Sequence, residues 1–456
     1  MLDLGQRNEL IVLDAVRHAP DGTSQSEVVA TSGLSRQAVS LITRRLREQG
    51  LIETDGTLAG SRGKPRTVLR IVPSARLTAG VHLDPSQIAL VVVDLLGRPV
   101  AHRSLPAPTD SPADDIERIA RALREMQAAL EAEGWHTPAG ATAREAMLGI
   151  GVASPGGIDV GRGLVVNPPW LPGWRDVPLV EGLEVATGLP VVLDKDTNAA
   201  LTAENWSTTQ RPEETVLYVF TGAGIGSAVS VGGRVHHGAA ALAGEIGHLP
   251  TGLDGKVCSC GRRACLSQFT DVSALLSAAA EAGLPTHRGA RDGTAGAADA
   301  IADGAVEGRG VVEGTEARDA IAGDAGEGRG TTGGAEARGA IGGGTVAGDS
   351  AASLALLARA ARDGEPPATS LLEAYGAALG EALRTLVGIH DPHRVVLGGP
   401  HWDLLASHVL PTIEERVRRD ASPEQVGIES SRLGSEVGAL GAAALFLQRE
   451  LSPAAR

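Results

Sequence analysis

The chain has three cysteines, and all of them lie in the short run CSCGRRAC, as Cys258, Cys260 and Cys265. His248 lies a little upstream, in the run GEIGHLP. Three thiolates and one imidazole form a complete tetrahedral ligand set for zinc, and such tight spacing favours one closed structural site. Because no position stays open for water, the sequence predicts a structural Zn²⁺ ion held by these four residues. The alternative is three buried or reactive cysteines that bind no metal.

Charge is distributed unevenly along the 456 residues, whose net charge is −14. Residues 34–76 carry nine basic side chains against three acidic ones, so a basic segment is joined to an acidic body. This asymmetry is typical of a regulator that holds DNA through one part only. Cysteines confined to one motif, with no signal-like N-terminus and no long apolar run, favour a cytoplasmic, nucleoid-associated protein without a membrane segment.

The N-terminal region carries the signals of three helices. Apolar residues at helical spacing predict a helix over 7–18. Ser24 and Glu27 form a capping box for a second helix, and Ser35 caps a third helix over 36–50. A glycine turn joins the second helix to the third, which is the arrangement of a helix-turn-helix.

A basic hairpin is predicted to follow these helices. It comprises a strand over 51–54, a turn at Asp55-Gly56, a basic glycine loop and a returning strand over 67–72. Helices and hairpin together predict a winged helix-turn-helix, although a helical packing or oligomerisation module is the alternative. The residues expected to contact DNA are Ser35, Arg36, Gln37, Ser40 and Arg44 in the major groove, and Arg62, Lys64 and Arg66 in the wing.

From Leu77 onward the pattern changes to α/β. Buried-strand patterns run into glycine loops at MLGIGVASPGGID, TVLYVFTGAGIG and RVVLGGP, and a strand leads into a helix at PVVLDKDTNAALTAENW. Strands that end in glycine loops bind small polar ligands in α/β folds. The body is therefore expected to be an α/β domain with a small-molecule site.

The motifs of the body resemble those of the ROK family, named for repressors, open reading frames and sugar kinases. In the family's order they are GIGVASPGGID, NPPWLPGW, LDKDTNAA, TGAGIG, GEIGH and CSCGRRACL. The resemblance covers nearly the whole chain, because family regulators also carry an N-terminal winged helix-turn-helix. It implies a two-lobed, actin-like ATPase fold, with sugar and nucleotide bound between the lobes. It divides the chain into a DNA-binding domain, 1–76, and a kinase-like effector and dimerisation domain, 77–456.

The resemblance also implies ligand residues. Asp196 matches the family's catalytic aspartate, which hydrogen-bonds a sugar hydroxyl and acts as the general base. Glu245 and His248 match a sugar-contacting pair in which the histidine is also a zinc ligand. Asn167 matches an asparagine that approaches the sugar. These four residues are the expected ligands of a sugar or sugar-phosphate effector.

The sequence departs from the family's kinases where ATP phosphates bind. His82 replaces an aspartate, and Asp84-Pro85-Ser86 replaces the Gly-Gly-Thr run that cradles the phosphates. Pro85 lacks a backbone N–H, and Asp84 places an anion near the phosphate position. Phosphoryl transfer needs positioned donors and neutralised charge, so these changes predict that kinase activity is lost. At the sugar site, Lys195 stands for the family's asparagine and Ser267 for its glutamate.

Residues 286–350 form a low-complexity insert with a tandem repeat of period 20. The repeat is compatible with a solenoid, but the scarcity of apolar residues favours a loop inserted in the body. No function is predicted for this insert.

The sequence thus predicts a sugar-responsive, DNA-binding transcriptional regulator, a repressor that is not an enzyme. Its two-fold symmetry would be that of a homodimer or a dimer of dimers on a pseudo-palindromic operator in double-stranded DNA. Two alternatives stay open. One is an active sugar kinase with an appended DNA-binding domain, and the other is a regulator that responds to a protein partner in place of a sugar.

Overall fold

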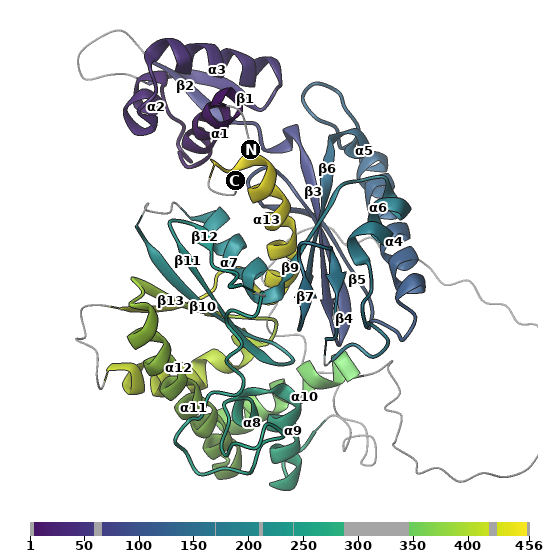
Figure 1. Cartoon of the computed structure of the whole chain (residues 1–456), viewed down its shortest axis with the longest axis vertical. Coiled ribbons are helices and arrows are strands. Elements are labelled where there is room, and N and C mark those ends of the chain that lie inside the picture. Colours follow the sequence, from purple (N-terminus) through teal and green to yellow (C-terminus); the bar gives the residue numbers. More distant parts are fainter. Residues whose placement is uncertain are drawn as a thin grey trace, which may run out of the picture.

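A computed structural model of the chain describes residues 4–58, 66–168, 170–208, 213–239, 241–286, 346–418 and 426–453. It has a small N-terminal unit followed by a larger body of two lobes, each built on a five-stranded sheet (Figure 1). The expected mixed α/β fold with a winged helix-turn-helix at its N-terminus is confirmed. No helix in the described part of the chain is long and apolar enough to cross a membrane.

The N-terminal unit is organised by the predicted helix caps. Ser24 and Glu27 form the capping box, because the Ser24 N–H donates to the Glu27 carboxylate at 2.7 Å and the Glu27 N–H donates to Ser24 Oγ at 3.4 Å. Ser35 Oγ accepts the Ala38 N–H at 3.2 Å and starts the third helix. The elements are α1 Leu4–Arg17, α2 Gln25–Ser32, α3 Arg36–Glu48, β1 Ile52–Leu58 and β2 Arg66–Ile71.

The predicted turn at Asp55-Gly56 is wrong. β1 continues through both residues to Leu58, and its register with β2 shifts between Thr54 and Thr57. Gly56 has a φ of 66°, in the left-handed region that favours glycine, so the strand accommodates it as an irregularity and keeps its pairing. The connection between β1 and β2 comes later, in residues 59–65, which the structure does not describe.

The first lobe is a mixed sheet with the order β5-β4-β3-β6-β9. β3, β6 and β9 are parallel, so their carboxyl ends lie at the same edge, while β4 and β5 add antiparallel strands. α4 and α6 cover one face (Figure 1). The elements are β3 Leu77–Asp84, β4 Gln87–Val93, β5 Pro99–Pro106, α4 Pro112–Ala132, α5 Ala143–Ala146, β6 Met147–Ser154, β7 Ile158–Asp159, β8 Leu164–Val165, α6 Leu179–Thr187 and β9 Val191–Lys195.

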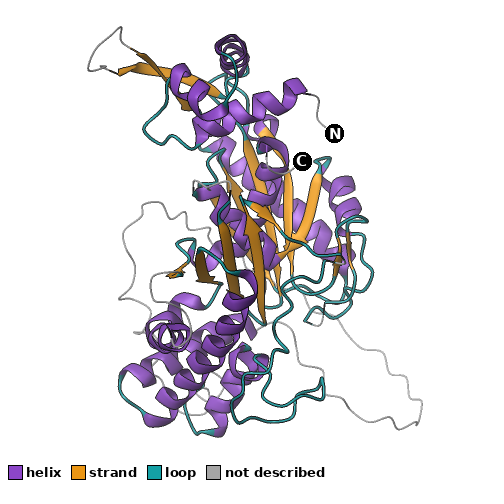
Figure 2. Cartoon of the chain, turned by 60° about the vertical axis from the view of Figure 1, so that its left-hand side comes forward, coloured by secondary structure: helices purple, strands orange, loops and turns teal. Residues whose placement is uncertain are grey.

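The second lobe has the sheet order β12-β11-β10-β13-β14. Its helices α8 to α12 gather at the end of the body that lies away from the N-terminal unit (Figures 1 and 2). α10 begins at Val346, inside the predicted 286–350 insert, whose residues 287–345 lie outside the described part of the chain. The elements are β10 Thr215–Thr221, β11 Ile225–Val231, β12 Arg234–Val235, α8 Ser267–Thr270, α9 Val272–Glu281, α10 Val346–Arg362, α11 Pro366–His390, β13 Arg394–Gly398, α12 Trp402–Arg418 and β14 Gly427–Ser430.

Two helices lie between the sheets and join the lobes. α7 (Asp196–Ser207) packs on β10 and β11, and α13 (Val437–Leu451) packs on α7 and on β3, β6 and β4 (Figure 1). Their contact needs glycine, because a Cβ on Gly441 would lie 2.4 Å from the backbone carbon of Ala199. Ten consecutive residues of α7 are buried, so this helix is enclosed on every side.

Candidate functional sites

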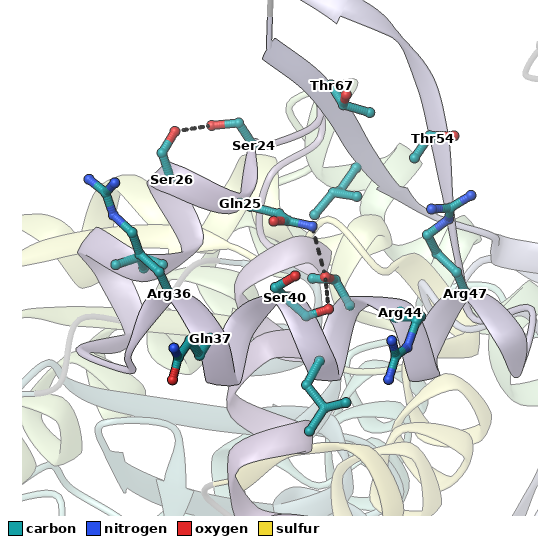
Figure 3. Close-up of a pocket in the computed structure, with 14 residues that line it drawn as sticks. Ser24, Gln25, Ser26, Arg36, Gln37, Ser40, Arg44, Arg47, Thr54 and Thr67 are labelled. Carbon is teal, nitrogen blue, oxygen red and sulfur yellow. Dashed lines mark hydrogen bonds between the residues drawn. The ribbon is translucent and has the colours of Figure 1, made fainter.

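The exposed face of α3 lines a groove of about 1060 Å³ between α2 and the β1–β2 pair (Figure 3). Gln25 of α2 donates to Thr43 Oγ1 at 3.0 Å, and the Thr43 hydroxyl donates to the Val39 carbonyl at 2.8 Å. This hydrogen-bond chain ties α2 to α3 and so fixes the shape of the groove. A groove-lining helix with polar and basic side chains has the form that reads the major groove of DNA.

Four of the five residues predicted on α3 line this groove. Arg36, Gln37, Ser40 and Arg44 are exposed and project from the helix (Figure 3). Ser35 is exposed but does not line the groove. It stands at the N-cap of α3, where its hydroxyl accepts the Ala38 N–H. The wing residues Arg62 and Lys64 lie outside the described residues, as does the side chain of Arg66.

Sequence reasoning missed further residues of the groove. Arg47 lies one turn after Arg44 on the same face, and that spacing was a usable signal. Thr54 and Thr67 line the groove from β1 and β2, so only the strand register reveals them. Leu41 is 41% exposed beside the polar residues, where it suits contact with a thymine methyl group.

A small cavity of about 100 Å³ lies between the two lobes. Its walls come from the carboxyl ends of β3 and β9, the start of α7 and the glycine turn after β10, and its charged lining residues are Asp84, Lys195, Asp196 and Glu245. Trp170 and Phe220 supply aromatic surface. Small-molecule pockets typically enclose about 300–1,000 Å³. A sugar therefore requires this cavity to widen.

Lys195 and Glu245 close the cavity with an ion pair. Lys195 Nζ lies 2.5 Å from Glu245 Oε1 and 3.4 Å from the Ala243 carbonyl oxygen. The Lys195 side chain is 4% exposed and the Glu245 side chain 54% exposed. A sugar hydroxyl that contacts Glu245 must therefore share the carboxylate with Lys195 or displace the Lys195 ammonium group.

Asp196 offers its carboxylate to a ligand in the cavity. The Asp196 carboxylate accepts the Thr197 N–H at 2.7 Å, and burial raises its pKa to about 7. The Thr197 hydroxyl is buried and has no hydrogen-bond partner among the described residues. The cavity thus holds an acceptor at the N-terminus of α7, next to a residue whose own hydroxyl is buried.

Two of the predicted sugar ligands do not line this cavity. Asn167 is exposed in the loop after β8, and His248 is exposed, with its Nδ1 atom 3.5 Å from the Cys258 sulfur. Ser267, at the family's glutamate position, does not line the cavity either. The structure brings together Asp196 and Glu245 from the predicted set, with Lys195 between them.

In the hairpin between β3 and β4, the donors of Ser86 are engaged by Asp84. Asp84 accepts the Ser86 N–H at 2.9 Å and also the Ser86 hydroxyl, and Pro85 has no N–H. His82 is buried, its burial lowers its pKa, and a Cβ on Gly438 would lie 2.3 Å from its Nδ1 atom. His82 is therefore a packing residue between β3 and α13.

The four predicted zinc ligands converge. Their ligand atoms all lie within 4.8 Å of one another, with 3.5 Å between the sulfurs of Cys260 and Cys265 and 3.5 Å from Cys258 Sγ to His248 Nδ1. In a tetrahedral zinc site these edges measure about 3.8 Å and about 3.5 Å. The donor set and its spacing therefore fit Zn²⁺, and the metal would cross-link the chain between His248 and Cys265.

Comparison with known proteins identifies the family. The ROK family model matches residues 78–449, and the MarR family model matches residues 5–57. This chain belongs to the ROK family. The family resemblance of the sequence motifs is thereby confirmed, including the N-terminal winged helix that precedes the ROK body.

The relatives of this ROK chain include both repressors and kinases. A putative xylose repressor of Caldicellulosiruptor sp. is 29% identical over 272 residues, which cover 60% of this chain and 65% of that protein. A glucokinase of Halalkalibacterium halodurans is 34% identical over 145 residues, or 31% of this chain and 43% of that one. The ROK chain thus spans less than two thirds of the length of these relatives.

Two solved structures share the fold of this ROK chain. A ROK family transcriptional regulator, described as a homolog of the E. coli MLC protein, has a TM-score of 0.69 at 20% identity, over 99% of this chain and 98% of that chain. A ROK hexokinase from Thermus thermophilus has a TM-score of 0.54 at 28% identity, over 81% and 97%. The regulator's match includes the N-terminal unit, which shows that the complete architecture recurs.

A second polar contact ties the two lobes of the ROK body together. His237, in the loop after β12, has Nε2 at 2.7 Å from Asp194 Oδ2, and Asn198 donates to Asp194 Oδ1 at 2.8 Å. The hydrogen bond that His237 donates to the Asp194 carboxylate raises the pKa of His237 above its ordinary value. The loop that carries Glu245 is therefore joined to β9 at two neighbouring positions, Asp194 and Lys195.

We expect the His237–Asp194 pair to stabilise the fold less as pH rises. The folded-state pKa of His237 is raised, so its contribution is complete below about pH 6.5 and is lost as pH rises through the folded-state value. The His237 side chain is 45% exposed, so the change in the free energy of unfolding should be about 1 kcal/mol or less. Denaturant unfolding of the wild type and His237→Gln at several pH values checks this. A difference between the two proteins that does not shrink with rising pH contradicts it.

Proposed function

We propose that this chain is a sugar-responsive, DNA-binding transcriptional regulator, a repressor that acts in the cytoplasm as a homodimer or a dimer of dimers and does not phosphorylate sugars. The observation that carries the proposal is the exposed groove of α3, with Arg36, Gln37, Ser40 and Arg44 along it, joined to a body with an interlobe cavity. Residues 1–76 would bind a pseudo-palindromic operator, one recognition helix in each half-site.

The sugar response is proposed for the interlobe cavity. Asp196 and Glu245 offer carboxylates that suit sugar hydroxyls, and Trp170 and Phe220 offer surface for a sugar ring. Relatives named xylose repressor support a sugar as the ligand, as does the glucokinase relationship. D-xylose and D-glucose are therefore the first sugars to test.

The loss of kinase activity is proposed from the β3–β4 hairpin. Ser86 donates both its N–H and its hydroxyl to Asp84, so neither is available to ATP phosphates, and the Asp84 carboxylate adds a negative charge. A general base such as Asp196 contributes only about 10²–10⁴-fold to a rate, so it cannot act alone when the phosphates are not held. The kinase relatives and the retained Asp196 favour the second candidate, an active kinase with a DNA-binding unit.

Two assays on the full-length chain test the proposal. Selection from a random duplex pool should enrich an inverted repeat, and calorimetric titration with D-xylose, D-glucose and ATP should detect sugar binding but no ATP turnover. If deletion of residues 1–76 leaves DNA binding intact, the DNA-binding assignment is wrong. ATP-dependent phosphorylation of either sugar, lost in Asp196→Asn, would instead establish the kinase.

We expect substitutions in the α3 groove to separate sequence reading from general DNA affinity. Arg36→Ala or Gln37→Ala should reduce discrimination against a mismatched base pair by about 1–3 kcal/mol, because each can make a bidentate base contact. Arg47→Ala should weaken binding to all DNA sequences. The slope of log affinity against log salt concentration should become shallower by about one, as expected for the loss of one phosphate contact. Binding isotherms at several salt concentrations check both effects.

Arg45→Ala is the matched control, since Arg45 is exposed on the same helix but does not line the groove. Its DNA affinity and salt dependence should equal those of the wild type. Equal losses in Arg45→Ala and Arg47→Ala would mean that the groove is not the DNA-binding surface.

A further inference from the structure

One side chain of the N-terminal unit is anchored on α7, the helix that begins at the interlobe cavity. Arg17, at the end of α1, places its guanidinium carbon 3.9 Å from the centre of the Trp206 ring. Arg17 Nη1 also donates to the Trp206 carbonyl oxygen at 2.5 Å. The Arg17 side chain is 9% exposed and Trp206 is 5% exposed, so the stacked pair is shielded from water.

The two ends of α7 therefore face two different sites. Asp196 and Thr197 line the cavity at its N-terminus, and Trp206 meets Arg17 at its C-terminus. The helix has 12 residues and so spans about 18 Å. Because ten of these residues are buried between two sheets and α13, α7 can only shift as a rigid body.

α1 in turn contacts the recognition helix. Val12, Leu13 and Val16 of α1 belong to the same hydrophobic core as Val39, Ile42 and Leu46 of α3. Trp206 and Ala203 of α7 belong to this core as well. A shift of α7 can thus reach α3 through α1. The contact of Arg17 with Trp206 fixes the position of α1 relative to α7.

We propose that the Arg17–Trp206 contact couples the interlobe cavity to the DNA-binding unit, with α7 as the moving element. The proposal rests on the proposed function, since it concerns how a sugar at the cavity alters operator affinity. A sugar that widens the cavity displaces the N-terminus of α7, and Trp206 carries α1 and α3 with it. Arg17 is a positioning residue, because it touches neither sugar nor DNA.

The test compares Arg17→Met with Arg98→Met in the full-length chain. Met keeps the length of the stem but removes the charge and the donors, and Asp14 retains His18 as a partner at 3.3 Å. Arg17, Trp206 and Arg98 line one cleft of about 850 Å³. Arg98 is exposed there and forms no ion pair among the described residues. We measure operator affinity, sugar affinity and the change in operator affinity that the sugar causes. The sugar used is D-xylose or D-glucose, whichever binds the wild type.

For Arg17→Met we expect each separate affinity to stay within about threefold of the wild type. The sugar-induced change in operator affinity, typically about 5–150-fold in coupled sites, should fall to near one. Arg17→Lys, which keeps the charge and a donor, should restore part of the coupling, and Arg98→Met should retain all of it. Full coupling in Arg17→Met, or equal loss in Arg98→Met, overturns the proposal.

Hydrogen exchange on the wild type gives a second readout, which holds even if Arg17→Met does not fold. The sugar should change the protection of amides in α1 and leave α4, on the outer face of the first lobe, unchanged. Unchanged protection in α1 overturns the proposal. A wild type that binds sugar without any change in operator affinity refutes the proposed function instead, so the two failures are distinguishable.

Discussion

Cys260→Ser should lower the zinc content from about one ion per chain to nearly none, because a structural site needs all four ligands. Structural zinc contributes about 10–16 kcal/mol of apparent binding free energy in small zinc-dependent folds at neutral pH, so its loss should open the segment between His248 and Cys265. Arg262 and Arg263 are exposed within this segment, and cleavage by trypsin after them should become much faster. Metal analysis and timed proteolysis measure both effects.

Ser259→Ala is the control for this substitution, since it changes the same turn and leaves the four ligands in place. It should keep both the zinc content and the resistance to trypsin. A wild-type protein purified without zinc, or a Cys260→Ser protein with unchanged metal content, would show that the cysteines serve another purpose.

Asp196→Asn should greatly weaken the response to sugar and leave operator affinity nearly unchanged. A hydrogen bond to a charged group contributes about 1.5–3 kcal/mol, so sugar affinity should fall by about 10- to 100-fold. Asp196 lies at the N-terminus of α7, far from the α3 groove, which is why DNA binding should persist. Asp254→Asn, at an exposed acid outside the cavity, is the control.

The same residue predicts a pH dependence. Burial raises the pKa of Asp196 to about 7, and only the carboxylate can accept a sugar hydroxyl at both oxygens. Sugar affinity should therefore rise by up to about tenfold between pH 6 and pH 8 and should be flat in Asp196→Asn. Affinity that falls over this range in the wild type would contradict the assignment of Asp196 as the acceptor.

The N-terminal unit was largely predictable because its signals are local. The capping box of Ser24 and Glu27 and the N-cap at Ser35 depend on residues three positions apart, and both are confirmed. The turn at Asp55-Gly56 was mispredicted for a related reason. An Asp-Gly pair favours a turn locally, but pairing of β1 with β2 continues past it and the left-handed glycine is absorbed within the strand.

The sequence indicated two carboxylates of the cavity, but it did not indicate the ion pair that one of them forms. Asp196 and Glu245 were expected to lie together from their motifs' resemblance to the family, and the structure brings both to one cavity. The Lys195–Glu245 ion pair joins residues 50 positions apart across the two lobes, so no local pattern reveals it. The Arg17–Trp206 contact spans 189 positions and is equally invisible in the sequence.

The most direct test of a sugar-responsive regulator is the thermodynamic linkage between its two ligands. Operator affinity is measured with and without saturating D-xylose or D-glucose, and sugar affinity is measured with and without the selected operator. Two coupled sites require the same factor in both directions, which we expect to be about fivefold or more. Sugar binding that leaves operator affinity unchanged, or no sugar binding combined with intact DNA binding, would contradict the account.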